Sequence, residues 1–268
     1  LRAMEKTLSL NCDVAVFDLE DAVGIKHKES ARDTVNNLLR SLKRNSESMN
    51  MNMKIVVRVN GMDTKWIKDD IASIVDLCDK IIIPKVSDAS MVNELDSLLT
   101  NKFKCNTPLW CMIETPHGVH NVYDIIRHKR VDGLMFGSND LSKELKAKQI
   151  PSREPLLYGM SRCINAARME NKLVFDGVHG DIKNIEGFNV TCIQGRDLGF
   201  DGKTLIHPSQ IEPCNTIYSP SASDMEWYRT IIYEWDHTEH DGILSINKKM
   251  IEKLHVDEAR EIVELYSI

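Results

Sequence analysis

The chain lacks a surplus of basic residues. It has 34 lysines and arginines against 40 aspartates and glutamates, a formal net charge of −6 at pH 7. Because binding to nucleic acid or to an anionic membrane surface draws on clustered positive charge, this balance disfavours both partners. We therefore expect small-molecule chemistry.

Long apolar runs are also missing. No stretch approaches the roughly 18 apolar residues that a membrane helix needs, and the opening residues LRAMEKTLSL match neither a signal peptide nor an Arg/Ser-rich transit peptide. We expect a soluble intracellular protein, in the cytoplasm or the mitochondrial matrix. The chain starts without an initiator Met, inside an expected helix, which is consistent with an upstream piece having been removed or left out.

Signals for disulfides are absent too. The seven cysteines are odd in number, contain no C-x-x-C pair and mostly sit in apolar surroundings. We interpret them as reduced core thiols. With 268 residues, of which 42% are hydrophobic and 28% charged, the chain is long enough to bury a sizeable core without cross-links.

What the chain does contain is a repeated pattern of seven short apolar runs, whose starts lie roughly 25 to 40 residues apart, the length of one strand–helix unit. The runs cover residues 14–17, 55–57, 81–83, 109–113, 134–136, 173–175 and 204–206. Apolar runs without polar alternation favour strands that are covered on both faces, as in parallel sheets.

Amphipathic helical patterns separate these runs, for example at residues 31–43, 64–77 and 88–99, with Thr64 and Asp88 placed as N-caps. This alternation leaves two α/β folds, a (β/α)8 TIM barrel and an open doubly wound sheet. No G-x-G-x-x-G follows a strand, so the nucleotide-binding open sheet loses support.

The character of the chain changes at Ser219. We predict a barrel domain over residues 1–218 and a C-terminal helical segment over 219–268, with a polar loop at 237–242 and a last helix from about residue 249. Its first helix carries Trp227, Tyr228 and Trp235, which favour packing against the barrel or a second subunit over a ligand site.

Polar residues gather where the apolar runs end. In a parallel barrel these positions face one common mouth, which is where active sites lie. They are Asp18, Glu20, Asp21, Arg58, Asn60, Lys85, Glu114, Thr115, Ser138, Asn139, Asp140, Asp176, His179, Asp181 and His207. So many acids would repel one another unless a cation were present.

Glu114 and Asp140 close consecutive runs and so fall on neighbouring strands, about 4.8 Å apart. Two carboxylates at that spacing can share a hard cation, and oxygen ligands favour Mg²⁺ or Mn²⁺ over Zn²⁺. The alternative is that Glu114 caps the amides of the next helix and Asp140 caps its own helix. Both interpretations stay open on spacing alone.

Arg58 lies inside an apolar strand, where a guanidinium is costly to bury without an anion. Its partner is either Glu20 or Asp21, or a substrate carboxylate. For His207 a structural role is favoured over that of a catalytic base.

The motifs DLEDAV at 18–23, VRVN at 57–60, PKV at 84–86, IET at 113–115, FGSNDL at 136–141, PLLY at 155–158, FDGV at 175–178 and GFDGKTLIHPSQI at 199–211 run through nearly the whole chain. In order and spacing the chain resembles the citrate lyase beta-subunit-like family, which includes malyl-CoA, citramalyl-CoA and citryl thioester lyases.

The resemblance implies a (β/α)8 barrel with a C-terminal lid, assembled as a homotrimer, and Mg²⁺-dependent cleavage of a carbon–carbon bond beside a thioester. Glu114 and Asp140 match the metal ligands, Arg58 matches the arginine that holds the substrate carboxylate, and Glu20 and Asp21 match acids that border the same pocket. In that mechanism the metal binds the carboxylate and hydroxyl of the substrate, so that an alkoxide can expel a thioester enolate.

Three features depart from the family. Its usual first strand, R-S-x-L-F-V-P, is missing, which predicts that this strand lies outside the given sequence, or that the barrel is open or completed by a partner. The lid motif M-I-D-x-P reads MIEKL at 250–254, so Glu252 replaces the Asp that acts on the next subunit's site. Asn139 replaces a frequent Glu.

The resulting prediction is a Mg²⁺ lyase that splits a 3-hydroxy-3-carboxy acyl-CoA of the malyl-CoA or citramalyl-CoA kind into an acyl-CoA and a 2-oxo acid. The alternatives are a thioesterase acting on the same substrates and a non-catalytic member with an assembly or ligand-binding role. Lys26, Lys28 and Lys85 are candidate contacts for the phosphates of CoA.

Overall fold

The computed structural model describes residues 2–45 and 53–266. The chain divides into two units, Leu1–Cys214 and Asn215–Ile268, by the contacts within each.

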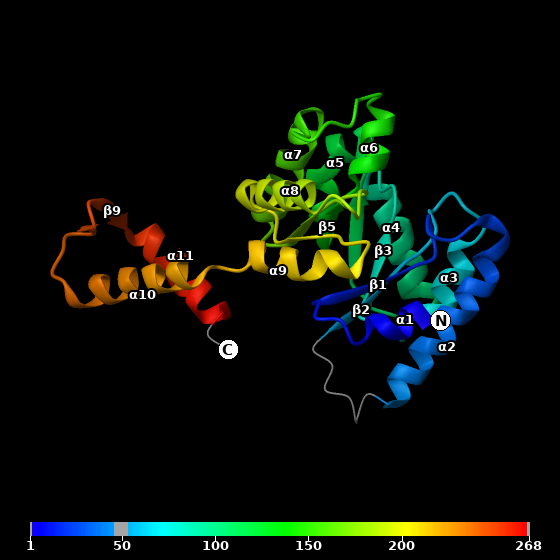
Figure 1. Cartoon of the computed structure of the whole chain (residues 1–268). Coiled ribbons are helices and arrows are strands. Elements are labelled where there is room, and N and C mark those ends of the chain that lie inside the picture. The colour runs from blue at the N-terminus through cyan, green and yellow to red at the C-terminus, as the bar shows by residue number, and fades with distance from the viewer. Residues whose placement is uncertain (1, 46–52, 267–268) are drawn as a thin grey trace. The chain divides into compact units, whose positions relative to one another are not determined.

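A parallel sheet of seven strands forms the centre of the first unit (Figure 1), and hydrogen bonding places the strands in sequence order. They are β1 (Val14–Asp18), β2 (Lys54–Arg58), β3 (Lys80–Ile83), β4 (Leu109–Ile113), β5 (Val131–Phe136), β6 (Leu173–Asp176) and β7 (Gly202–Lys203). β4 is buried at every position, as expected for a strand covered on both faces. The predicted α/β class and parallel sheet are confirmed.

The sheet is curled, which its inner face makes clear. Val56, Ile82, Trp110, Met112 and Met135, from four successive strands, form one buried cluster. Val14 of β1 and Phe175 of β6 pack against the same cluster from either side. Side chains from strands so far apart in a sheet reach one cluster because the sheet bends around it.

The curled sheet is a half-barrel of seven strands, so the predicted (β/α)8 barrel is confirmed only as a curled parallel sheet. In the part of the chain that the structure describes, β1 pairs only with β2 and β7 only with β6. Val16, which lies beside Val56 on the inner face of β1, is 37% exposed. The seven strands of the described residues agree in number with the seven apolar runs of the sequence.

One predicted strand is displaced. Residues 204–206 were expected to form the last strand, but β7 is Gly202–Lys203 and Ile206 is half exposed. The Lys203 side chain is fully buried and its ammonium contacts Asp176 at 2.7 Å. A lysine that is buried because it is paired interrupts the apolar pattern by which strands are recognised.

Helices follow the strands and cover the sheet (Figure 1). Those of the first unit are α1 (Arg2–Thr7), η1 (Ile25–His27), α2 (Lys28–Asn45), α3 (Ile67–Ile74), α4 (Ala89–Ser97), η2 (Leu98–Lys102), α5 (Pro116–Ile126), α6 (Ser138–Glu144), η3 (Glu154–Leu156), α7 (Leu157–Met169), α8 (Ile185–Leu198) and η4 (Pro208–Gln210), while α9 (Ile211–Tyr218) leads into the second unit. None of the helices described is long and apolar enough to cross a bilayer.

The structure confirms one of the two predicted N-caps. Asp88 caps α4, since its side chain accepts hydrogen bonds from the amides of Ser90 and Met91. Thr64 does not cap a helix, because α3 begins at Ile67 and the Thr64 hydroxyl donates to the carbonyl of Gly61. The residues before α3 form a turn that delays the start of the helix.

The second unit consists of α10 (Ala222–His237), an antiparallel hairpin of β8 (Ile243–Ile246) and β9 (Lys249–Glu252), and α11 (Lys253–Tyr266). The sequence prediction missed this hairpin and began the last helix too early. Asn247 and Lys248 both have positive φ, 50° and 65°, which suits the tight turn of a two-residue hairpin.

The aromatic residues of α10 pack within their own unit. Ile231, Ile246, Ile251, Val256 and Ala259 form its core, and Trp227, Tyr228, Ile232, Trp235 and Leu244 pack against them. These aromatic side chains therefore pack against the core of the second unit. The sequence interpretation assigned them to contacts with the barrel or a second subunit and did not include this core.

All seven cysteines are free thiols. Cys105, Cys111, Cys163, Cys192 and Cys214 are buried, and the other two are partly exposed. This confirms that the cysteines mostly belong to the core.

Candidate active site

Charged side chains meet above the inner apolar cluster, at the carboxyl ends of the strands. Arg58 lies two residues after Val56, and Glu114 lies two residues after Met112, so both share the inner face. The Arg58 Nη1 atom is 3.6 Å from the Met112 sulfur, which places the guanidinium directly over the cluster.

Arg58 is held by the loop that follows β1. Its Nε and Nη2 donate to the two carboxylate oxygens of Asp18 at 2.8 and 2.5 Å, while its Nη1 lies 3.0 Å from Glu20 Oε2 and 3.8 Å from Asp21. The predicted pairing with Glu20 and Asp21 is therefore present, but the two-point partner is Asp18. Burial opposes the charge of both side chains, yet their mutual contact raises the pKa of Arg58 and lowers the pKa of Asp18.

The loop after β1 is itself fixed from two sides. Asp18 accepts hydrogen bonds from the amides of Glu20 and Ala22. The ammonium of Lys28, a buried residue, donates to the carbonyls of Leu19 and Glu20 at 2.8 and 2.7 Å. Lys28 thus shapes the loop that carries Glu20, and this use of its ammonium argues against the predicted contact with CoA phosphates.

Lys85 connects the remaining acids. Its backbone amide donates to Glu114 Oε1 at 2.8 Å, and its ammonium lies 2.8 Å from Glu20 Oε1 and 3.2 Å from Asp140 Oδ2. The residue has a φ of 54°, a left-handed conformation that is unusual for a lysine and that the surrounding contacts must impose. Glu20, Glu114 and Asp140 thus come together around Lys85, a strand-end residue for which the sequence suggested only a contact with CoA phosphates.

Glu114 is buried, and burial raises its pKa to about 7, helped by the nearby charges of Glu20 and Asp140. Gly137 makes room for this side chain, since a Cβ atom there would lie 2.3 Å from the Cβ and 2.4 Å from the Oε2 of Glu114. The carboxyl group is therefore poised to change its protonation state near neutral pH.

Neither of the capping roles considered for these two acids is found. The N-cap of α5 is Thr115, whose hydroxyl accepts from the amide of Gly118, and the N-cap position of α6 is Gly137. Asp140 lies in the first turn of α6 with its carboxylate on Lys85. Both acids are thus directed to the strand-end cluster.

The cluster has an excess of negative charge. Arg58 and Lys85 face five carboxyl groups, which are Asp18, Glu20, Asp21, Glu114 and Asp140. The buried Glu20 Oε2 has an ion contact but no hydrogen bond.

Such a set of oxygen donors fits Mg²⁺, with Glu114 and Asp140 as the side chains that could hold it. Within the described ranges, no three His, Cys, Asp or Glu side chains are already arranged as a metal site. The donor set is consistent with two protein ligands, which leave positions for water and substrate.

Other strand-end residues have structural partners. Asn60 binds the buried Asp70, and Asp176 binds Arg153 and Lys203. His207 caps η4 by accepting from the Ser209 amide, a contact that fits the structural role the sequence favoured.

Glu252 belongs to the second unit, where its amide donates to His255 Nδ1, and Asn139 accepts from Gln149. The catalytic role expected of Glu252 stays a prediction.

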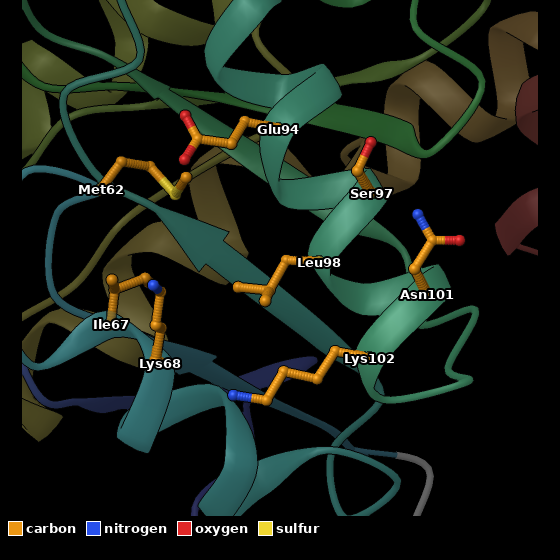
Figure 2. Close-up of a pocket in the computed structure, with 8 residues that line it drawn as sticks. All are labelled: Met62, Ile67, Lys68, Glu94, Ser97, Leu98, Asn101 and Lys102. Carbon is orange, nitrogen blue, oxygen red and sulfur yellow. The ribbon is translucent and has the colours of Figure 1, made fainter.

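A separate cleft of about 380 Å³ opens between α3 and the α4–η2 segment. Figure 2 shows Leu98 and Lys102 pointing toward the segment that carries Ile67 and Lys68. None of the strand-end acids lines this cleft, so it is distinct from the candidate active site.

Two relatives align with almost the whole chain. A (3S)-malyl-CoA thioesterase of Cereibacter sphaeroides is 39% identical over 264 residues, which are 97% of this chain and 88% of the relative. The citrate lyase subunit beta of Leuconostoc mesenteroides subsp. cremoris is 33% identical over 263 residues, 94% and 85% of the two chains.

Solved structures share the fold. CitE of Mycobacterium tuberculosis, in complex with magnesium, acetoacetate and coenzyme A, superposes with a TM-score of 0.79 at 23% identity and covers 96% of this chain and 91% of its own. The citrate lyase beta subunit from the same organism, complexed with oxaloacetate and magnesium, has a TM-score of 0.68 at 25% identity, covering 82% and 92%. Structural neighbours of this chain thus hold magnesium.

A family model extends over most of the chain. The model of the HpcH/HpaI aldolase/citrate lyase family matches residues 2–208, which include every strand and every strand-end acid of the first unit. The chain belongs to the HpcH/HpaI aldolase/citrate lyase family.

Proposed function

We propose that the protein is a Mg²⁺-dependent lyase that cleaves a 3-hydroxy-3-carboxy acyl-CoA, of the malyl-CoA or citramalyl-CoA kind, into an acyl-CoA and a 2-oxo acid. The observation that carries the proposal is the meeting of Glu20, Glu114 and Asp140 around Lys85, with Arg58 beside them. Family membership and the magnesium in related structures support it.

Glu114 and Asp140 would hold the metal. When bound, Mg²⁺ would polarise the oxygens of the substrate and favour the loss of the hydroxyl proton. Since a metal ligand must be ionised, Glu114 has to lose its proton, and its pKa of about 7 allows this at neutral pH.

Arg58 would orient a carboxylate of the substrate. Asp18 fixes two of its three nitrogens, so the guanidinium is rigid, and Nη1 remains the arm that faces Glu20 and Asp21. A substrate carboxylate would bind this arm in competition with those two acids. Orientation by a rigid group lowers the entropic part of the barrier.

We also propose the finer architecture that the resemblance implies. One further strand between β1 and β7 would close the barrel, and the exposed Val16 on the inner face supports this. The segment 219–268 would act as a lid in a homotrimer, in which Glu252 reaches the site of the next subunit.

Thioester hydrolysis is the second candidate, favoured by the 39% identity to a (3S)-malyl-CoA thioesterase. The same site could serve it, because a metal held by Glu114 and Asp140 would activate a water for attack on the thioester.

One assay separates these functions. Purified protein is incubated with Mg²⁺ and malyl-, methylmalyl- or citramalyl-CoA while acetyl-CoA, propionyl-CoA and free CoA are followed. A shorter acyl-CoA establishes the lyase, and free CoA alone establishes the thioesterase. Absence of turnover, with substrate binding retained, would leave a non-catalytic family member.

A further inference from the structure

Lys85 occupies a central position among the acids of the site. Its ammonium bridges Glu20 Oε1 at 2.8 Å and Asp140 Oδ2 at 3.2 Å, two oxygens from the loop after β1 and from the first turn of α6. Its backbone amide holds Glu114 Oε1 at 2.8 Å. One residue therefore contacts both of the acids to which we assign the metal.

The ammonium supplies positive charge at the place where the acids need it. Like charges held this close repel one another unless a cation lies between them. The other cation of the cluster, Arg58, is bound to Asp18, Glu20 and Asp21, and no contact joins it to Asp140 among the residues described. Lys85 is the cationic side chain that neutralises Asp140 in this structure.

A divalent ion would need the oxygen that Lys85 now contacts. Because Asp140 is not buried and half of the Lys85 side chain is exposed, with relative exposures of 30% and 46%, the ammonium has room to leave this acid while it keeps Glu20. The positive φ of Lys85 and its amide contact with Glu114 keep the backbone in place during such an exchange.

We propose that Lys85 is an internal cation that competes with the divalent metal at Asp140 and so sets the metal affinity of the site. The proposal rests on the metal site of the proposed function. It assigns Lys85 a positioning role that keeps the acids together before the metal binds, at the cost of weaker metal binding.

The test measures binding of Mn²⁺ to the full chain by electron paramagnetic resonance, with thermal unfolding of the metal-free protein as a second readout. The variants are Lys85→Met, which keeps the length but removes the charge, and Lys85→Arg, which keeps the charge. Lys143→Met, an exposed lysine of α6, is the matched control for net charge.

The proposal expects Lys85→Met to bind Mn²⁺ about 10-fold more tightly than the native protein and to unfold at a lower temperature without metal, since the unscreened acids then repel. Lys85→Arg and Lys143→Met stay close to the native protein in both measurements. Unchanged or weaker Mn²⁺ binding by a folded Lys85→Met protein overturns the proposal.

Asp140→Ala separates this proposal from the metal site on which it rests. Weakened Mn²⁺ binding in Asp140→Ala, together with no gain in Lys85→Met, leaves the metal site standing and refutes competition by Lys85. Native Mn²⁺ binding in Asp140→Ala removes the metal site and the competition with it.

Discussion

Two groups of charged side chains lie at the same edge of the sheet but on opposite faces. On the inner face, Arg58 and Lys85 meet five carboxyl groups. On the outer face, Asp176 alone meets Arg153 and Lys203, and the side chains of Asp176 and Lys203 are fully buried. The inner group has too few cations and the outer group has too few anions.

The outer group is saturated with hydrogen bonds. Asp176 accepts from Arg153 at 2.8 Å through both oxygens, from Lys203 at 2.7 Å and from the amide of Gly177 at 2.8 Å. Arg153 further donates to Thr191 and Gln194 of α8. Such a network ties helix to sheet, and it leaves no free acid for a ligand. The ratio of anionic to cationic side chains therefore distinguishes a structural charge cluster from one that can bind a cation.

The largest effect is expected for Asp176→Asn. The substitution leaves the buried Lys203 and the partly buried Arg153 without their anion, and breaking such a pair typically costs about 3 to 5 kcal/mol of stability. Urea unfolding monitored by circular dichroism measures this loss. The control Asp181→Asn, in the following loop, alters an exposed aspartate and should unfold like the native protein. A small loss in Asp176→Asn would mean that the outer group is not structural.

The corresponding substitution on the inner face, Glu114→Gln, should act on binding instead of stability. It removes a proposed metal ligand, and we expect Mg²⁺ or Mn²⁺ affinity to fall by at least about 100-fold. Stability at pH 8 should not decrease, because a buried charge that repels Glu20 and Asp140 is lost. Calorimetric titration measures the affinity, with the exposed Glu144→Gln as the control.

The inner group should also make stability depend on pH. The folded-state pKa of Glu114, about 7, lies above its ordinary value of 4.5. Between these values the folded protein binds a proton that the unfolded chain has released, so stability is present at low pH and is lost as the pH rises through 7. For a shift of this size the contribution of Glu114 amounts to about 3 kcal/mol.

The contribution of Glu114 has to be measured as the difference in stability between the native protein and Glu114→Gln. Burial lowers the pKa of His128 and His179, and these groups make stability rise with pH in the same range. Asp18, whose pKa is lowered, acts only below its ordinary value of 3.8. The metal-free native protein should therefore lose stability relative to Glu114→Gln between pH 5 and 8. Parallel pH profiles would show that Glu114 titrates normally.

The sequence predicted the strands and the acids because both depend on local patterns. Unbroken apolar runs identified the buried parallel strands, and residues after those runs necessarily share one edge of the sheet. Glu20, Asp21, Arg58, Glu114 and Asp140 were all found in this way, and the structure brings them together.

These local patterns could not predict which residues far apart in the sequence pair with one another. Lys203 is buried because Asp176, 27 positions earlier, neutralises it, so the last strand was misplaced. Asp18 and Lys85 were recognised as strand-end residues, but their partners depend on loop conformation and on a positive φ that no spacing reveals. The hairpin β8–β9 was not predicted, because its turn residues, Asn247 and Lys248, resemble an ordinary polar loop.

The smallest effect should come from His207→Ala, a residue at the same edge that belongs to neither group. Its ring accepts from the amide of Ser209 and caps the single turn η4, so its loss should cost about 0.5 to 1 kcal/mol of stability. Turnover and its pH profile should stay native, because no contact joins His207 to the inner acids in the described part of the chain. A 10-fold loss of turnover in a folded protein would instead make His207 a catalytic base and extend the inner group beyond the residues assigned to it.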